Sequence, residues 1–460
     1  MSGAPRIARG ALGIVFLALV VLGSCRAPMT VYHNAPSLAP GTRPEMNTAG
    51  FWIGRHPDPD AVIMTGADIL WFNEHVRVRT GAVYDVLRFS PERDGLSLKD
   101  SMRRVLGYVS SKGYATRDGR KASAAFLPAM KAAVDIDGIP ARVRVRWGLA
   151  VNNCDQRLLP SSQPLYKSPT DTNIDRLQNN TLDIATPVAV LHQSIGGEWL
   201  YVISPFSDGW VEARNVALCT RDEIADFQVS PSFVVVTDAK ADLFGDPALR
   251  RHSAYLHMGV RLPVFVEPET EVIQVRVPSR TGDGRCAFEA AYVGGAQVSR
   301  GYLAYTPRNA IRQAFKLLHA PYGWGGLYGE QDCSRFIQEI FATMGVVMPR
   351  NSTQQAKVGR AVASFGKKTA GAERSLALSG QATGGITLLQ FPGHIMLFLG
   401  MVDGTPFAIH DIFAYSEPAE PAERLMAINR VAVTSLALGS GTKKGSLLER
   451  LAMVRSVSPE

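Results

Sequence analysis

The last third of the chain begins with two stretches in which apolar residues recur at helical spacing. Thr306 and Pro307 supply an N-cap and a first-turn proline for the first helix. The apolar positions are Ala310, Ile311, Ala314, Phe315 and Leu318 in the first stretch and Phe336, Ile337, Ile340, Phe341 and Met344 in the second. Strand-like runs follow between 385 and 415. Helices followed by an antiparallel sheet predict an α+β domain over 301–460.

Upstream of this domain the pattern changes to short strands separated by turn residues. Between 141 and 225 the runs alternate or are uniformly apolar, with Gly, Pro, Asn and Asp between them. They read ARVRVRWGLAV, TPVAVLHQ, EWLYVISP and GWVEARNV. A second strand-rich segment over 226–300 contains SFVVVTD, GVRLPVFVE and EVIQVRVP. Short strands at this spacing predict two small β-barrels, the second from composition and context rather than from a sharp motif.

The part of the chain before residue 141 divides into a helical and an irregular segment. The stretch LKDSMRRVLGYVSSKG has helical periodicity and stops at Gly113. Its apolar positions are Met102, Val105, Leu106 and Val109. We therefore expect a helix-containing N-terminal module over 61–140. Residues 28–60 are rich in Pro, Asn and Gly, so we expect 25–60 to be an extended leader that tethers or wraps the body of the protein.

Length and charge bound the class of protein. A chain of 460 residues is too long for one hydrophobic core, and its composition is that of a globular protein. The net charge is +8, but Lys and Arg are scattered and no basic block with interleaved aromatics marks a nucleic-acid surface. We expect no nucleic-acid partner. A mildly basic surface also suits a polyanionic cell wall or acidic lipids, between which charge alone does not choose.

The extreme N-terminus has the pattern of an export signal. Arg6 and Arg9 precede the apolar run ALGIVFLALVVLG, which is too short to span a bilayer comfortably. The following LGSC, Leu22 to Cys25, resembles a bacterial lipobox, in which the cysteine becomes the lipidated first residue of the mature protein. An ordinary signal peptide with an incidental cysteine is the alternative. We expect residues 1–24 to be a signal peptide and the protein to be an exported lipoprotein, membrane-anchored through Cys25 and facing the periplasm or the cell surface.

Four further cysteines follow Cys25. Export permits a disulfide, and Cys154 with Cys219 is the favoured pair because these residues bracket one predicted barrel, although no spacing rule requires it. Cys286 and Cys333 remain. A small buried hydrophobic side chain is the ordinary role of a lone cysteine.

Cys333 differs from the others because it lies in EQDCSRF, at the start of the second predicted helix. The core-facing positions begin at Phe336, so Cys333 lies in the first turn, at the positive end of the helix dipole, where a thiolate is favoured. A nucleophilic thiol also needs a base and a group that orients the base. Taken singly, His394 and His410 are more simply surface or hydrogen-bonded residues. Together they fit, because His394 starts one predicted strand, His410 ends the next, and antiparallel pairing would bring them side by side.

These residues resemble the NlpC/P60 cysteine peptidases, papain-related enzymes that cut bacterial cell-wall peptides. The shared stretches are YGWGGLYGEQDCSR, MPRNSTQQ, PGHIMLFLG and AIH. The resemblance implies that Cys333 is the nucleophile, that His394 is the base and later the acid, and that His410 orients His394. In the first barrel, EWLYVISPFSDGWVEARNVAL resembles the last strands of a bacterial SH3 domain. We therefore expect SH3-like all-β barrels over 141–225 and 226–300, followed by a papain-like α+β catalytic domain.

The same resemblance assigns residues around the triad. Tyr322 matches a tyrosine near the oxyanion pocket, and Trp324 belongs to the same Tyr-x-Trp-Gly-Gly motif. In the subgroup with SH3 domains, the residues matching Asp332 and Ser352 bind the free amine of an N-terminal L-alanine, and a carboxylate is chemically suited to an ammonium ion. Helix N-capping is the alternative role of both. Arg335 replaces the family's glycine, and we expect it close to the cleft, where it would reshape the substrate subsites.

One feature of that subgroup has no counterpart in the sequence. The first SH3 domain often presents a tyrosine to the cleft shortly before the GWV strand, and FSDGW contains none. Phe206 or Trp210 could substitute, although core packing is the simpler role for either.

Together these features predict a peptidase that cuts peptidoglycan stem peptides with a free N-terminal L-alanine between γ-D-glutamate and the L-diamino acid. One alternative is an N-acetylmuramoyl-L-alanine amidase, against which an amine-binding Asp332 argues. Another is a non-catalytic peptidoglycan-binding lipoprotein, against which an intact triad argues. No ligand cluster indicates a metal, no cofactor is expected, and we expect a monomer. Recycling of wall fragments and trimming of the intact wall stay equally open.

Overall fold

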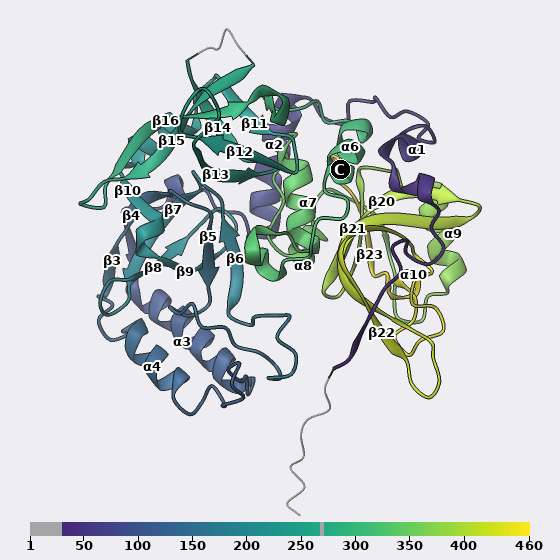
Figure 1. The fold of residues 1–460 in the computed structure, drawn as a ribbon, viewed down its shortest axis with the longest axis horizontal. Coiled ribbons are helices and arrows are strands. Elements are labelled where there is room, and N and C mark those ends of the chain that lie inside the picture. Colours follow the sequence, from purple (N-terminus) through teal and green to yellow (C-terminus); the bar gives the residue numbers. More distant parts are fainter. Residues whose placement is uncertain (1–29, 267–270) are drawn as a thin grey trace, which may run out of the picture.

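Three β-rich units surround one central helix in the computed structural model, which describes residues 30–266 and 271–460 (Figure 1). Each unit contains a seven-stranded sheet within these residues. The two barrels lie on one side, and the C-terminal domain packs against them through α7 (Cys333–Ala342). This arrangement confirms the multidomain architecture predicted from the sequence. The predicted signal peptide 1–24 and Cys25 lie outside the described residues.

The C-terminal domain packs its helices on a sheet, as the apolar pattern predicts. Thr306 caps α6 (Pro307–Lys316) by accepting a hydrogen bond from the Asn309 N–H. The apolar faces of α6 and α7 share one core with β20 (His394–Val402) and β21 (Thr405–Glu417). The sheet order is β1-β22-β21-β20-β19-β23-β18. The other elements are β1 (Tyr32–Asn34), β18 (Arg360–Ser364), β19 (Thr387–Phe391), β22 (Arg424–Ser435), β23 (Met453–Ser456), α8 (Ser352–Gln355), α9 (Gly371–Gln381) and α10 (Leu447–Arg450).

The two barrels consist of short strands and are joined by α5 (Arg221–Gln228). The strands of the first barrel are β4 (Arg146–Ala150), β5 (Cys154–Arg157), β6 (Gln178–Leu182), β7 (Pro187–Gln193), β8 (Trp199–Ile203), β9 (Asp208–Glu212) and β10 (Val216–Cys219). Those of the second are β11 (Phe233–Val236), β12 (Lys240–Phe244), β13 (His252–His257), β14 (Arg261–Val266), β15 (Val272–Arg280), β16 (Cys286–Gly294) and β17 (Val298–Arg300). Trp210 is 1% exposed and packs edge-on against Tyr201, so it is a core residue. Phe206 packs against the core of the C-terminal domain.

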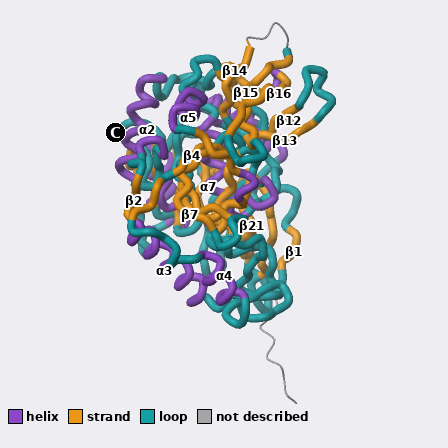
Figure 2. Tube along the Cα trace, turned by 90° about the vertical axis from the view of Figure 1, so that its left-hand side faces the viewer, coloured by secondary structure: helices purple, strands orange, loops and turns teal. Residues whose placement is uncertain are grey.

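The segment 61–140 does not fold as one module. α2 (Gly66–Thr80) packs on the C-terminal domain, whereas α3 (Gly95–Ser111) and α4 (Phe126–Val134) pack on the first barrel. In Figure 1 and in Figure 2, α2 lies apart from the other two helices. An amphipathic helix needs an apolar surface to cover, and this segment reaches two different ones.

The remaining short elements of the described chain are β2 (Glu92–Asp94), β3 (Arg142–Arg144), and the 3-10 turns η1 (Pro44–Asn47), η2 (Val86–Arg88), η3 (Ala213–Asn215) and η4 (Gly295–Gln297).

The leader wraps the C-terminal domain and is only partly extended. β1 pairs in parallel with β22, with Tyr32 opposite Leu425. α1 (Ala49–Ile53) places Trp52, which is 1% exposed, in the core that α7 also faces. The Trp52 Nε1–H donates to the Met46 carbonyl at 2.7 Å. The leader is therefore held by buried side chains as well as by strand pairing.

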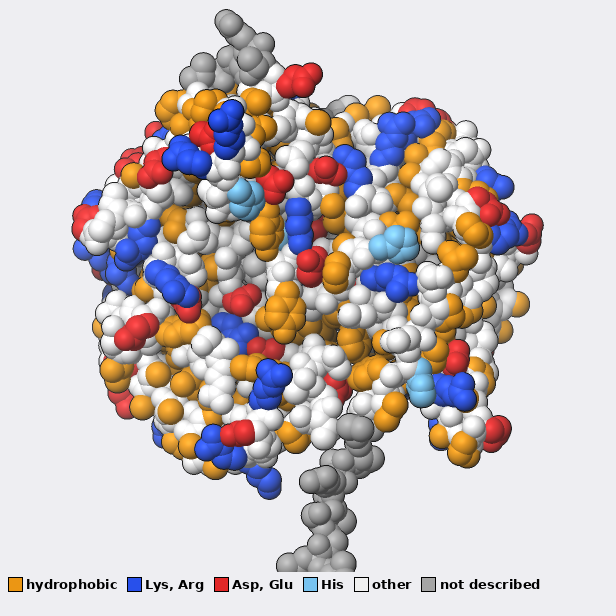
Figure 3. Space-filling view, in the orientation of Figure 1, with side chains coloured by type: hydrophobic (Ala, Val, Ile, Leu, Met, Phe, Trp, Pro, Cys, Tyr) orange, Lys and Arg blue, Asp and Glu red, His pale blue; other side chains and the backbone are white. Residues whose placement is uncertain are grey.

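The surface gives no sign of a nucleic-acid stripe on the face shown in Figure 3, where charged side chains of both signs are scattered. In the part of the chain that the structure describes, no helix is both long and apolar enough to cross a bilayer.

Arg335 joins the domains and does not line the cleft. Its guanidinium donates to Asp183 Oδ1 at 2.6 Å and to the Thr181 carbonyl at 2.9 Å, both in the first barrel. It also donates to Glu339 Oε1 at 2.7 Å on its own helix. Positions two apart on a helix point about 200° away from each other, so Arg335 faces the barrel while Cys333 faces the start of β20. The structure thus contradicts the expectation that Arg335 shapes the subsites.

One carboxylate connects all three units. Asp183 of the first barrel accepts from Arg335 and lies 2.5 Å from the His257 ring of the second barrel. The other nitrogen of His257 lies 3.1 Å from the Gly329 carbonyl in the C-terminal domain. Burial alone would raise the pKa of Asp183, but the charges of Arg335 and His257 hold it well below its usual range.

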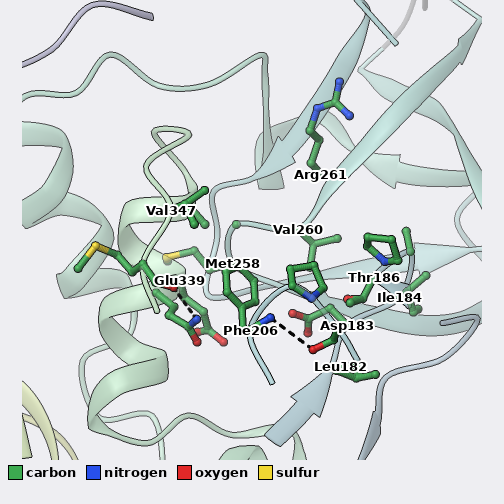
Figure 4. A pocket seen from close by; sticks show the side chains of 18 of the residues that line it. Leu182, Asp183, Ile184, Thr186, Phe206, Met258, Val260, Arg261, Glu339 and Val347 are labelled. Atoms are coloured by element: carbon green, nitrogen blue, oxygen red, sulfur yellow. Dashed lines mark hydrogen bonds between the residues drawn. The ribbon is translucent and has the colours of Figure 1, made fainter. Parts of the chain in front are cut away.

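A cavity of about 530 Å³ lies beside this ion pair, where the three units meet. Figure 4 shows Leu182, Ile184 and Val260 of the barrels across the cavity from Glu339 and Val347 of the C-terminal domain. Its lining is largely apolar, so the buried charges next to it depend on one another for compensation.

Replacing Arg335 with Met is expected to lower the free energy of unfolding by about 3–5 kcal/mol, because the buried Glu339 and the partly buried Asp183 would both lose the guanidinium that compensates their charges. Urea denaturation followed by tryptophan fluorescence measures the change. The difference from wild type should shrink below about pH 4, because a carboxylate with a lowered pKa stabilises the fold only where the unfolded chain is ionised.

Arg103→Met is the matched control for this substitution. Arg103 and Asp100 form an exposed pair at 3.0 Å, whose loss is expected to cost less than about 1 kcal/mol. Equal effects of Arg335→Met and Arg103→Met would contradict a supporting role for the buried pair.

Candidate active site

Cys333 is the first residue of α7 and is 7% exposed. The backbone N–H of Ile395 is close enough to lower the pKa of the thiol, so the sulfur lies near the start of β20, directly after His394. Burial raises the pKa of the Cys333 thiol, the charge of Asp332 raises it further, and the Ile395 N–H offsets this only in part. A thiol with a raised pKa needs a base to become a nucleophile.

The two histidines form a hydrogen-bonded chain with Thr434 of β22. The distance is 2.6 Å from His394 Nε2 to His410 Nδ1 and 2.8 Å from His410 Nε2 to Thr434 Oγ1. Antiparallel pairing thus brings the rings together as predicted, although His410 lies inside β21 rather than at its end. If each Nε2–H donates toward Thr434, Nδ1 of His394 is left as the unprotonated nitrogen. This tautomer gives His394 the lone pair that a base requires.

Both imidazoles are neutral at rest. Burial lowers the pKa of His394 to about 3, and the nearby charge of Arg450 acts in the same direction. Burial and the neighbouring His394 also hold the pKa of His410 well below its usual range. A neutral imidazole beside a neutral thiol is the resting state of a proton-transfer pair.

The carboxylate of Asp332 is already fully occupied. It caps α7 by accepting from the Ser334 and Arg335 N–H groups at 3.1 and 2.9 Å, and it accepts from the Gly325 N–H at 3.1 Å. Arg350 pairs with both of its oxygens, at 3.0 and 2.7 Å. Burial would raise the pKa of Asp332, but Arg350 and these hydrogen bonds lower it to about 2. Its capping role is observed, and its charge is neutralised by Arg350 rather than left free for an ammonium ion.

Ser352 starts α8 and does not cap it. Asn351 is the cap, and its Oδ1 accepts from the Gln354 N–H at 3.0 Å. Ser352 is 8% exposed, and its carbonyl accepts from the Ala356 N–H. The structure therefore does not support the capping alternative for Ser352.

Tyr322 lies near Cys333 and Trp324 lies toward the first barrel. Burial raises the pKa of Tyr322 well above its usual range, with the Cys333 sulfur as the next cause. Its ring centroid is 5.7 Å from that of Phe413 on β21. Trp324 begins the turn η5 (Trp324–Gly329), and the Arg176 guanidinium of the first barrel lies 5.4 Å from its ring centroid.

The two glycines of the Tyr-x-Trp-Gly-Gly motif let the barrel approach the site. Gly325 and Gly326 have φ values of 65° and 89°. A Cβ at Gly325 would lie 2.8 Å from Gln178 Cγ, and one at Gly326 would lie 2.4 Å from Thr181 Oγ1. Side chains here would both strain the backbone and push β6 away.

Three residues near the site were not found from the sequence. Neither Thr434 nor Arg350 belongs to a local sequence motif. The pairing of β21 with β22 brings Thr434 to the site, and the chain after α7 turns back so that Arg350 reaches Asp332. Asp411 follows His410 and is buried, with no hydrogen-bond partner for either carboxylate oxygen among the described residues. Burial raises its pKa well above its usual range. A charged residue in a strand normally faces solvent, so the sequence position of Asp411 did not predict its burial.

The favoured disulfide is not formed. Cys154 is buried on β5, Cys219 ends β10, and both are free thiols. β5 and β10 are not neighbours in the sheet order. Bracketing one barrel in sequence therefore did not bring the two sulfurs together. Within residues 30–266 and 271–460, no group of three His, Cys, Asp or Glu side chains is arranged to hold a metal ion.

Two family models match the chain. Residues 319–410 match the NlpC/P60 family and contain Cys333, His394 and His410. Residues 164–212 match an SH3 domain (SH3b1 type) and lie inside the first barrel.

Known proteins resemble the chain over different lengths. The gamma-D-glutamyl-L-lysine dipeptidyl-peptidase of Bacillus cereus is 28% identical over 202 residues, which span 42% of this chain and 57% of that protein. The structure of an NlpC/P60 endopeptidase from Photobacterium damselae subsp. piscicida superposes with a TM-score of 0.72 at 17% identity, covering 95% of this chain and 99% of that one. The likeness in fold thus includes the barrels and the N-terminal segments. The chain therefore carries an SH3 domain ahead of a C-terminal NlpC/P60 domain.

Proposed function

We propose that the protein is a cysteine peptidase that cuts peptidoglycan stem peptides between γ-D-glutamate and the L-diamino acid. The observation that carries the proposal is the hydrogen-bonded chain from Thr434 through His410 to His394, which directly precedes Ile395, the residue whose backbone N–H acts on the buried thiol of Cys333. These are the parts of an acyl-transfer site. The Bacillus cereus relative is a γ-D-glutamyl-L-lysine dipeptidyl-peptidase, which supports the substrate class.

The proposed reaction begins with proton transfer from Cys333 Sγ to His394 Nδ1. The sulfur attacks the scissile carbonyl carbon, and the backbone N–H of Cys333 donates to the oxyanion. His410 accepts from His394 Nε2–H and so stabilises the imidazolium that forms. His394 then protonates the leaving amine, and a water molecule deprotonated by His394 hydrolyses the acyl-enzyme. Tyr322 keeps its hydroxyl proton, because burial raises its pKa, and supplies a second donor near the sulfur.

The proposal includes a requirement for a free N-terminal L-alanine, but this requirement no longer rests on Asp332. The expected amine ligand Asp332 has its charge balanced by Arg350. The requirement therefore rests on the likeness to a dipeptidyl-peptidase, and Ser352, buried near the site, stays the proposed polar contact.

The proposed setting of the reaction is outside the cytoplasm. The pattern of residues 1–25 supports export and a lipid anchor on Cys25. The SH3 domain supports binding to peptidoglycan. We propose a monomeric lipoprotein that faces the periplasm or the cell surface.

An N-acetylmuramoyl-L-alanine amidase is the second candidate. The same thiol and histidines would serve it. The main argument against it was an Asp332 that binds ammonium, and the ion pair with Arg350 at 2.7 Å removes that argument.

Incubation with L-Ala-γ-D-Glu-diaminopimelate, followed by mass spectrometry, is expected to show release of L-Ala-γ-D-Glu by the wild-type protein. Cys333→Ala should lower turnover at least about 10³-fold, because it removes the atom that forms the acyl-enzyme. Cys219→Ser is the matched control, since this thiol lies in the first barrel, and it should keep full activity.

The N-acetylated form of the same peptide separates the candidates. Cleavage of the free peptide alone supports an amine-reading subsite, and equal cleavage of both contradicts it. If neither is cut but a muramoyl-peptide loses its peptide, the protein is an amidase.

Thr434→Val is expected to lower kcat by about tenfold with little change in KM, because it removes one hydrogen bond that orients His410. Thr434→Ser keeps the hydroxyl and should restore most of the activity. An equal loss in both variants, or a loss confined to KM, would contradict the orienting role. Steady-state kinetics on the free peptide measures all three proteins.

A further inference from the structure

Two cysteines meet where the barrels touch. Cys219 is the last residue of β10 in the first barrel, and Cys286 is the first residue of β16 in the second. The Leu218 N–H donates to the Gly284 carbonyl at 2.9 Å, and Leu218 forms a parallel bridge with Arg285. The next residue on each strand is a cysteine, so the two cysteines occupy opposite positions of one parallel pair.

This register suits a disulfide. Neighbouring strands lie about 4.8 Å apart, and disulfides join residues whose Cα atoms are about 4.4–6.8 Å apart. Each cysteine side chain is the largest influence on the pKa of the other, since Cys286 raises the pKa of Cys219 and Cys219 lowers the pKa of Cys286. The two side chains therefore lie close together. The Cys219 thiol donates to the Ala217 carbonyl at 3.6 Å and the Cys286 thiol donates to the Ala287 carbonyl at 3.5 Å, and both residues are only half-buried.

The other described cysteines have different surroundings. Cys154 is buried in the core of the first barrel, and Cys333 is buried at the start of α7. Neither Cys154 nor Cys333 lies where β10 runs alongside the segment before β16. We propose that Cys219 and Cys286 form a disulfide that joins the two barrels in the exported protein. The proposal rests on the export that is part of the proposed function and is independent of the peptidase activity.

Formation of this bond needs an oxidant, a dithiol–disulfide oxidoreductase or oxidised glutathione. The Cys286 thiolate attacks a sulfur of the oxidant's disulfide, which breaks that disulfide and releases one thiol. Cys219 then loses its proton and attacks the Cys286 sulfur of the mixed disulfide, which releases the second thiol. Two electrons and two protons pass to the oxidant, and the Cys219–Cys286 bond remains.

The bond would fix the junction between the barrels. α5 and β11 to β15 lie between the two cysteines in sequence, so the crosslink closes a long loop and restricts the unfolded chain. The second barrel also supplies His257 to the buried Asp183 pair, and it would then be held to the first barrel at two separate places.

The test uses the full chain, equilibrated in a buffer in which the ratio of reduced to oxidised glutathione gives the redox potential of an oxidising compartment. Free thiols are alkylated under denaturing conditions, and the digest is analysed by mass spectrometry without reduction. A linked pair of peptides containing Cys219 and Cys286, lighter than the sum by two hydrogen atoms, is the expected result. Cys154 and Cys333 should be fully alkylated.

One variant keeps the outcome interpretable. In Cys219→Ser, Cys286 should become fully alkylated, and the melting temperature of this variant should not respond to a reductant, whereas that of oxidised wild type should fall. Full alkylation of both cysteines in the oxidised wild type, or a link from Cys219 to Cys154, would overturn the proposal. The readout does not use peptide cleavage, so its failure is distinct from failure of the peptidase assignment.

Discussion

The buried ion pair between Asp332 and Arg350 is the interaction on which the site depends. Asp332 caps the helix that begins with Cys333 and also holds the loop of Gly325 through its backbone N–H. Arg350 reaches in addition to Asn180 Oδ1 of the first barrel at 2.6 Å. Because both charges are buried, removal of either would leave the other uncompensated. The helix start, the motif loop and the barrel are thus held by one charge pair, and Cys333 is fixed with them.

Burial then decides the chemistry of the resting state. It raises the pKa of Cys333 and lowers that of His394, so both groups are neutral before substrate binds. An ion pair of thiolate and imidazolium is favoured only when hydrogen bonds support it, and in the proposed reaction the oxyanion donors and the link to His410 would do so. A neutral resting thiol is also less open to oxidation than a thiolate.

Sequence patterns predicted what depends on local rules. Apolar periodicity predicted α6, α7 and the strands that follow, because each of these elements buries one face, and strand order predicted that His394 and His410 meet. The predictions that failed concern residues whose neighbours belong to another unit of the protein. Arg335 was expected at the cleft but faces the barrel, and Cys219 was paired with Cys154 although its strand meets Cys286 instead. Thr434 could not be found, since only the register of β21 with β22 brings it to His410.

The burial of Trp52 in the C-terminal core has a consequence for biosynthesis. Trp52 leaves the ribosome early, while the helices and strands that cover it are made roughly 250 or more residues later, a delay of roughly ten seconds or longer at about 5–20 residues per second. Through that interval α1 has no partner to pack on. Without Trp52 and α2, the core of the C-terminal domain would be left partly uncovered. An export route that keeps the chain unfolded until synthesis is complete would suit this order of assembly.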